Sequence, residues 1–146
     1  MGIFDKFKRK GNKDDAIENL ARKHSKTAVD YAKSFQKKFD YSPDSIKDLE
    51  EILDYYSNDI SASQPTENQI WSMAIIFGSY LGEVMLKNGL GKKGFHWGKD
   101  DNSDIPLLSD QSGNFITPND KVYKRLVNGA EDNVVSFYDI IMENNW

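Results

Sequence analysis

Apolar residues recur at intervals of three and four along much of this chain. Such stripes cover residues 14–39, 43–56 and 66–88, and the first two are opposed by charged faces. This spacing is typical of helices that bury one face. The pattern therefore predicts three consecutive helices. The third is the most apolar, so we expect it to be central to the fold.

Residues with strong local preferences mark the ends of these helices. In "YSP", residues 41–43, serine is suited to the N-cap and proline to the first helical position. Pro65-Thr66 starts the third helix, with Thr66 or Pro65 near its first turn, and residues 88–89 (Asn-Gly) close it. We expect residues 57–64 to form a polar linker between the second and third helices.

Periodicity changes after the third helix. Residues 89–118 are rich in Gly and Pro, with short apolar bursts between them. Three of these bursts, at residues 95–98, 105–109 and 114–117, predict short strands. Residues 110–113 have the composition of a hairpin turn. We therefore expect a small three-stranded antiparallel sheet.

The remainder of the chain returns to helical spacing. Thr117 and Pro118 predict a capped helix that ends at Asn128-Gly129, and residues 131–143 predict a last helix. The fold class is thus α+β, with three N-terminal helices, a small three-stranded antiparallel sheet and two C-terminal helices. We expect residues 14–146 to form one domain and residues 1–13 a basic, flexible tail.

Charge divides the chain into two parts. The net charge of the 146 residues is −4. Residues 1–39 hold 11 Lys or Arg against 5 Asp or Glu, a net charge of +6, whereas residues 40–146 hold 8 against 18, a net charge of −10. An acidic body repels phosphate backbones, which argues against nucleic-acid binding. The absence of cysteine excludes disulfides and thiolate chemistry and fits a reducing cytoplasm.

The first ten residues, "MGIFDKFKRK", allow two interpretations. Three apolar residues at helical spacing have four cations around them: Ile3, Phe4 and Phe7, with Lys6, Lys8, Arg9 and Lys10. Such a segment could make weak contact with an anionic membrane. It could also be a flexible basic start, which we favour because three apolar side chains bury little area.

Two glycines interrupt the most apolar helix. Gly78 and Gly82 each cost a helix about 1 kcal/mol relative to alanine. At this i, i+4 spacing they form a groove that another helix backbone can approach closely. Alternatively, the groove opens onto a ligand, with Tyr80 and Glu83 pointing into it. A buried Glu83 would need a partner, for which the sequence offers Lys87 at i+4 or His96 on the sheet.

The glycine helix and the strand after it resemble a known family. The stretch "FGSYLGEVMLKNG" followed by "FHW" is similar to uncharacterised bacterial domains of unknown function, which carry a Gly-x-Tyr-Leu-Gly-Glu helix motif and then a Gly/Trp strand. The matching residues are Gly78, Tyr80, Leu81, Gly82, Glu83 and Trp97. The resemblance covers residues 41–143 and implies no activity.

Sequence motifs for catalysis or metal binding are missing. His24 and His96 do not occur in a metal-binding arrangement, and we expect His24 to be a half-buried structural residue. Residues 100–104, "DDNSD", resemble the start of a calcium loop but lack its glycine and its bidentate glutamate. We expect no catalytic residues, no cofactor and no metal.

These features favour a cytoplasmic, non-enzymatic protein-binding module, such as an adaptor or an immunity-like protein. Its acidic body would attract a basic protein partner. We expect this partner to contact Asp48, Glu51 and Asp54 on the second helix, with an aromatic anchor beside them. The candidates for the anchor are Tyr55, Tyr56, Trp97 and Trp146. Tyr80 and Glu83 are the remaining candidate binding residues. The alternative is a peripheral membrane protein tethered by its basic N-terminus.

Overall fold

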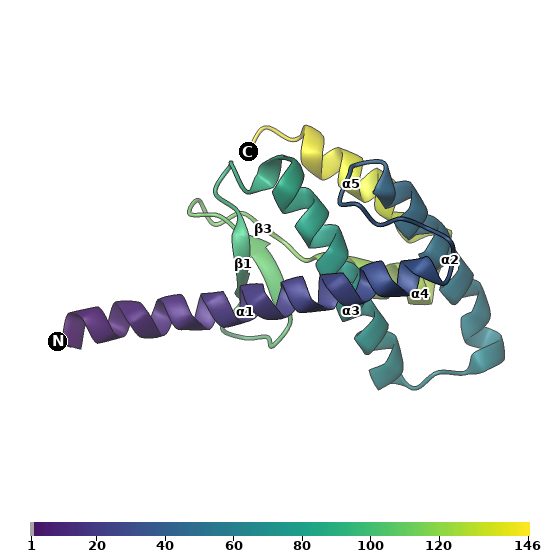
Figure 1. Ribbon diagram of the computed structural model, residues 1–146, viewed down its shortest axis with the longest axis horizontal. Helices are drawn as coiled ribbons and strands as arrows, with labels where there is room; N and C mark the ends of the chain where they lie inside the picture. Colours follow the sequence, from purple (N-terminus) through teal and green to yellow (C-terminus); the bar gives the residue numbers. More distant parts are fainter. Residues whose placement is uncertain (1) are drawn as a thin grey trace.

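The computed structural model describes the backbone of residues 2–146 and the side chains from residue 15 onward. Within this range it contains five α-helices and one three-stranded antiparallel sheet, so the predicted α+β class is confirmed (Figure 1). The elements are α1 (Gly2–Lys33), α2 (Ser45–Ser63), α3 (Glu67–Met85), β1 (His96–Lys99), β2 (Pro106–Ser109), β3 (Phe115–Ile116), α4 (Pro118–Asn128) and α5 (Val134–Glu143). A π-helical turn (Leu86–Leu90) follows α3, and a 3-10 turn (Ala130–Asp132) precedes α5.

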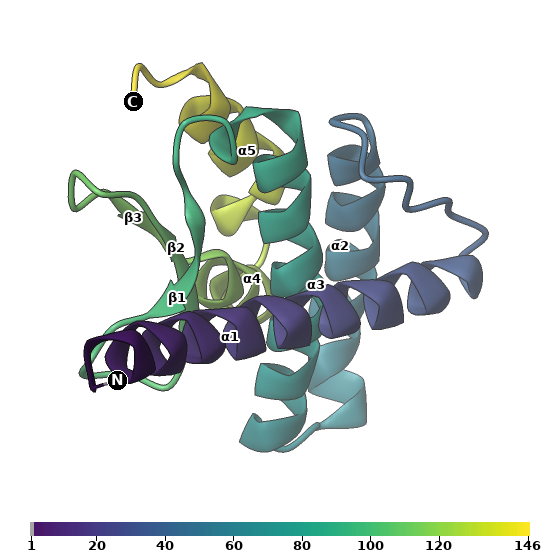
Figure 2. The same ribbon diagram turned by 60° about the vertical axis from the view of Figure 1, so that its left-hand side comes forward.

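Helix α3 is the centre of the molecule. Helix α1 crosses it on one side, and α4 packs against it on another (Figure 2). Helix α2 packs against α4 and α5, and the sheet contacts α1 through β1. The strands follow the order β1-β2-β3, with Trp97 opposite Leu108 and Leu108 opposite Ile116.

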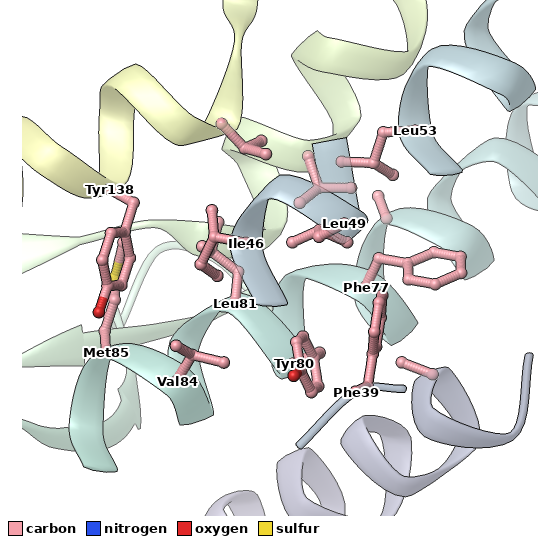
Figure 3. Close-up of a cluster of buried hydrophobic side chains, with 14 of the residues drawn as sticks. Phe39, Ile46, Leu49, Leu53, Phe77, Tyr80, Leu81, Val84, Met85 and Tyr138 are labelled. Atoms are coloured by element: carbon pink, nitrogen blue, oxygen red, sulfur yellow. The ribbon is translucent and has the colours of Figure 1, made fainter. Parts of the chain in front are cut away.

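The core lies between α2, α3 and the segment that follows α1 (Figure 3). Leu49 and Leu53 of α2 and Phe77 and Leu81 of α3 are inaccessible to solvent, and Phe39 closes the cluster. Fully burying such a side chain contributes about 1.5–3 kcal/mol. The apolar stripes read from the sequence are therefore the faces that hold these elements together.

The two glycines of α3 admit close neighbours. A Cβ added to Gly78 would lie 2.5 Å from Asn119 Cα, so the first turn of α4 occupies the space of a side chain. A Cβ on Gly82 would overlap the indole ring of Trp97. The approach at Gly78 is the close helix contact that the spacing predicts, whereas at Gly82 the neighbour is an aromatic ring. Contact area gained in this way offsets the helix propensity lost to glycine.

Helix α1 differs from its predicted range at both ends. It begins at Gly2 and continues through Gly11 and Asn12, where the sequence predicted a break. A single glycine costs a formed helix only about 1 kcal/mol, so it does not by itself end one. The helix ends at Lys33 rather than at residue 39, and Gln36 then takes a left-handed conformation (φ 58). Flexibility of residues 1–13 stays a prediction.

Helix α2 starts later and ends later than predicted. Ser42 caps the turn before it, accepting from the Ser45 N–H at 3.2 Å, and the helix itself begins at Ser45. It continues to Ser63, so the polar linker predicted at 57–64 is wrong for most of its length. Ile60, one turn after Tyr56, extends the half-buried face through this polar stretch.

The strands agree with the sequence to within one or two residues at each end. The turn predicted between β2 and β3 is closed by Asp110, whose carboxylate accepts hydrogen bonds from the backbone N–H groups of Ser112 and Asn114. Hydrogen bonds from the side chain and the backbone N–H of Asn114 lower the pKa of Asp110. Helix α5 begins three residues late, because Asn133 caps it by accepting from Val135 and Ser136.

Candidate functional site

An open groove lies between α2 and α3, near the loop that joins them, and we call it the α2–α3 groove. Its volume is about 520 Å³. Tyr56 and Ile60 of α2 line one wall, and Met73 and Ile76 of α3 line the other. Tyr31 of α1 closes one end. The lining is mainly apolar, so the groove could contact an apolar surface of another molecule.

Capping interactions fix the ends of the two helices at their short connection. Gln64 ends α2 in a left-handed conformation (φ 47). Thr66 then caps α3 by accepting from the Gln69 N–H at 3.1 Å, while the Gln69 side chain accepts from the Thr66 N–H at 2.8 Å. This reciprocal capping box fixes where α3 starts. The backbones of α2 and α3 make few close approaches, although the helices are consecutive.

Aromatic rings form the rim nearest α1. Tyr31 is 40% exposed, and Tyr56 is half-buried, with its ring 6.1 Å from that of Phe77 and 5.6 Å from that of Phe35. Burial raises the pKa of Tyr56, and the nearby Tyr31 and Tyr55 hydroxyls raise it further. The Tyr56 hydroxyl is therefore neutral at physiological pH. The rim offers ring faces and edges for contact, together with an uncharged hydroxyl group.

The charge of the groove walls is negative. Helices α2 and α3 together carry seven acidic residues and one lysine, a net charge of −6. Among the residues that line the groove, Asp59 alone carries a charge, and its side chain is exposed. The site thus combines an apolar floor with an exposed carboxylate on its rim.

The acids predicted to form a binding surface have cations of the same chain beside them. Lys37 Nζ lies 3.5 Å from Asp48 and 2.6 Å from Glu51. Asp54 accepts a hydrogen bond from Arg125 at 2.6 Å. These pairs leave less negative charge for a basic partner here than the sequence indicates.

Arg125 of α4 is the buried member of this network. Its side chain is 1% exposed, and it binds Glu50 through Nε at 3.0 Å and Nη2 at 2.7 Å, and Asp54 through Nη2. The hydrogen bonds that the guanidinium donates to Glu50 raise the pKa of Arg125 above its usual value. Glu50 also accepts from the backbone N–H of Val134 at 3.1 Å, so one carboxylate joins α2, α4 and α5.

Glu83 and Trp97 of the predicted site do come together. Glu83 is 6% exposed and accepts from the Trp97 indole N–H at 3.1 Å, and Arg22 lies 3.9 Å from its other oxygen. Lys87 or His96 was predicted as the partner, which is wrong. Neighbouring strand residues point to opposite faces, so Trp97 faces inward and His96 is exposed. Trp97 is 1% exposed and cannot anchor a partner at the surface.

Tyr80 belongs to a different set of contacts. Its hydroxyl donates to Ser45 Oγ at 2.7 Å and accepts from the backbone N–H of Tyr41 at 3.0 Å. Burial raises the pKa of Tyr80 to about 12. Its ring stacks on Phe39, with 4.3 Å between the centroids. Tyr80 therefore fastens the segment after α1 to α3 and shares no pocket with Glu83.

Candidate metal ligands are dispersed. Among the residues whose side chains are described, no group of three or more His, Cys, Asp or Glu could hold a metal ion. In the β1–β2 turn, Asp100 accepts from the backbone N–H of Asn102, and Asp104 pairs with Lys99 at 3.5 Å. His24 is half-buried, as predicted, and this burial lowers its pKa, helped by the charge of Lys23.

Sequence reasoning missed both the groove and Arg125. The signal for the groove was the excess width of the apolar face on α3, where Ile76 lies beside the stripe that packs inward. For Arg125 no local signal exists, because Glu50 and Asp54 precede it by 75 and 71 residues. The membrane contact predicted for residues 3–10 lies outside the residues whose side chains are described.

No family model, curated protein or solved structure matches this chain. The resemblance carried by residues 78–83 and Trp97 therefore stays a prediction. Within residues 2–146, one helical stretch, Glu67–Leu90, is long and apolar enough to cross a membrane. In the protein, 61% of its most apolar window is buried, and α1 and α4 pack against it. This is the environment of a core helix.

Proposed function

We propose that this protein is a cytoplasmic, non-enzymatic binding module that holds an apolar, positively charged segment of a basic protein partner in the α2–α3 groove. The observation that carries the proposal is an exposed apolar groove in the most acidic pair of helices. Apolar contact with such a groove supplies affinity, and the surrounding negative charge selects cationic partners and speeds their association.

An amphipathic helix is the partner geometry that fits these walls. Such helices insert side chains at i, i+3 and i+4 into a groove between two helices. Ile60, Met73 and Ile76 offer the apolar contacts, and the aromatic rim at Tyr31 offers an edge for a larger side chain. A lysine or arginine one turn further along the partner would reach Asp59.

The lining argues for binding rather than for chemistry. General acid–base catalysis needs two titratable groups within reach of one substrate. The groove offers a single exposed carboxylate, at Asp59, and a tyrosine, Tyr56, whose pKa is raised by burial. Asp48, Glu51 and Asp54 add little to this proposal, because Lys37 and Arg125 already compensate their charge.

A designed helical peptide of leucine and lysine tests the proposal, with its leucine and glutamate analogue for comparison. The cationic peptide should bind and should shift the amide resonances of α2 and α3 that border the groove. Ile76→Asp should weaken this binding by about tenfold or more. Ile140→Asp is the matched control, because Ile140 is 71% exposed on α5, outside the groove. Equal binding to wild type and Ile76→Asp, with both folded by circular dichroism, would refute the assignment.

A further inference from the structure

The N-terminal segment of this chain has the chemistry that the groove requires. Residues 2–13 carry five Lys or Arg and one Asp, a net charge of +4, together with three large apolar residues. We infer that the N-terminal segment of a second copy is an occupant of the α2–α3 groove, so that the protein associates with itself. This inference rests on the proposed function of the groove.

Helical spacing places the apolar residues of the segment on one side. Helix α1 includes residues 2–13, and successive residues of a helix are about 100° apart. Ile3, Phe4 and Phe7 therefore fall within an arc of about 100°. The structure describes the course of the helix through this stretch and not its side chains, whose chemistry comes from the sequence. An apolar arc bordered by cations matches an apolar groove that carries the carboxylate of Asp59 and lies in an acidic pair of helices.

The segment also has suitable length and position. Its twelve residues span about 18 Å as a helix, whereas the groove wall between Ile70 and Ile76 spans about 9 Å. Figure 1 shows the first turns of α1 extending past the sheet, away from the body of the molecule. They are therefore placed to meet another molecule.

The groove of the same molecule is out of reach. Tyr31, which lies at one end of the groove, is 29 residues from Gly2 on the same continuous helix, about 44 Å away. A helix cannot fold back on itself over that distance without a break. Occupation by the segment therefore requires a second copy.

The surfaces that meet in this arrangement are different from each other. The basic segment of one molecule contacts the groove of the next, so the pair retains one free groove, on the first molecule, and one free segment, on the second. Contacts of this type either close into a ring or add further copies. The net charges of +6 on residues 1–39 and −10 on residues 40–146 favour the same head-to-tail pairing. Salt should weaken it.

Sedimentation equilibrium of the full-length protein tests the inference. The weight-average mass should rise with concentration at low salt and fall toward that of a monomer in about 1 M salt. Deletion of residues 2–13 and the variant Ile76→Asp should each leave a monomer, while Ile140→Asp should associate like the wild type. A labelled peptide of residues 2–13 should bind the deletion variant, and Ile76→Asp in that variant should weaken binding by about tenfold.

Several results would overturn the inference. Undiminished association of the deletion variant would place the contact elsewhere. Failure of the 2–13 peptide while the leucine and lysine peptide still binds would reject this occupant and leave the proposed function standing, whereas failure of both would reject the two together. A full-length protein that stays monomeric but binds phosphatidylserine vesicles through residues 2–13 would assign the segment to membranes instead.

Discussion

The guanidinium of Arg125 lies where α2, α4 and α5 meet, with Glu50 on one side and Asp54 on the other. Removing one partner of a buried ion pair is costly because it leaves an uncompensated charge in a poorly solvated place. The cost is larger than the net contribution of the pair itself. The stability of this region therefore depends on charged residues, Arg125 and Glu50, whose burial cannot be read from the sequence.

Arg125→Ala should therefore lower the free energy of unfolding by about 3–5 kcal/mol. The physical reason is that Glu50 loses both of its guanidinium hydrogen bonds and Asp54 loses its cation. Urea denaturation at neutral pH would measure the change. Lys37→Ala is the matched control, because Lys37 also bridges two acids of α2 but does so in solvent, and it should cost much less. Similar losses in the two variants would contradict this account.

Gly78 tests the close approach of α4. Alanine would gain about 1 kcal/mol of helix propensity. It would also place a Cβ against the backbone of Asn119, which cannot move without shifting the first turn of α4. We expect Gly78→Ala to cost a net 1–3 kcal/mol, roughly the range for overpacked sites. The comparison is Gly98→Ala, since no atom lies within 4 Å of that added Cβ. Equal thermal unfolding midpoints for Gly78→Ala and Gly98→Ala would count against the close contact between α4 and Gly78.

Tyr80 adds a dependence on pH. The pKa of a free tyrosine is about 10, and burial raises that of Tyr80 to about 12. Because the folded state favours the neutral phenol, this stabilisation is complete below pH 10. It is lost as the pH rises through the range between these two values.

Tyr80→Phe should cost about 1 kcal/mol at neutral pH, because the hydrogen bonds to Ser45 and Tyr41 disappear. The difference between variant and wild type should then shrink as the pH is raised above 10 and reverse in sign before about pH 12, because the variant has no phenol to ionise. Urea titrations at a series of pH values would show it. A difference that stays constant across the series would mean that Tyr80 is not the titrating group.

At the scale of elements, the sequence was sufficient to predict a helix end wherever a capping residue determines that end. The start of α3 at Thr66 and the end of α4 before Gly129 could be read directly from the sequence. The extension of α2 to Ser63 could not, because it depends on Ile60 finding a place against other helices. The groove was invisible for the same reason. The spacing of apolar residues predicts that a helix has an apolar face. It does not predict whether that face is covered, because this depends on where elements distant in the sequence are placed.

The first turns of α1 extend past the body of the molecule, and we expect them to contribute little to its stability. Deleting residues 2–13 should leave the thermal unfolding midpoint almost unchanged in dilute solution, because the segment extends past the body that the core stabilises. Differential scanning fluorimetry at low protein concentration would test it. A large drop would mean that the segment packs against its own molecule, and it would also count against docking on a second copy.

At the scale of the whole molecule, basic and acidic residues are concentrated on different elements. The basic residues are concentrated on α1, and the acidic residues on α2, the turns and α5. This separation could be predicted from the sequence, because charge is counted along the chain and needs no fold. What required the structure was the observation that much of the negative charge on α2 is already compensated, while the groove beside it is exposed.

The partners of the Glu50 carboxylate are synthesised much later than Glu50 itself, which affects folding during translation. Its two partners, Arg125 and the Val134 amide, are 75 and 84 residues further along the chain. A ribosome therefore exposes α2 and the apolar face of α3 well before the residues that complete their packing exist. A nascent chain stopped at Thr117 should stay sensitive to protease, and resistance should come only once α4 and α5 have been added. The packing around α3 can close only after these two helices have been synthesised, so the apolar surface of α3 stays uncovered until then.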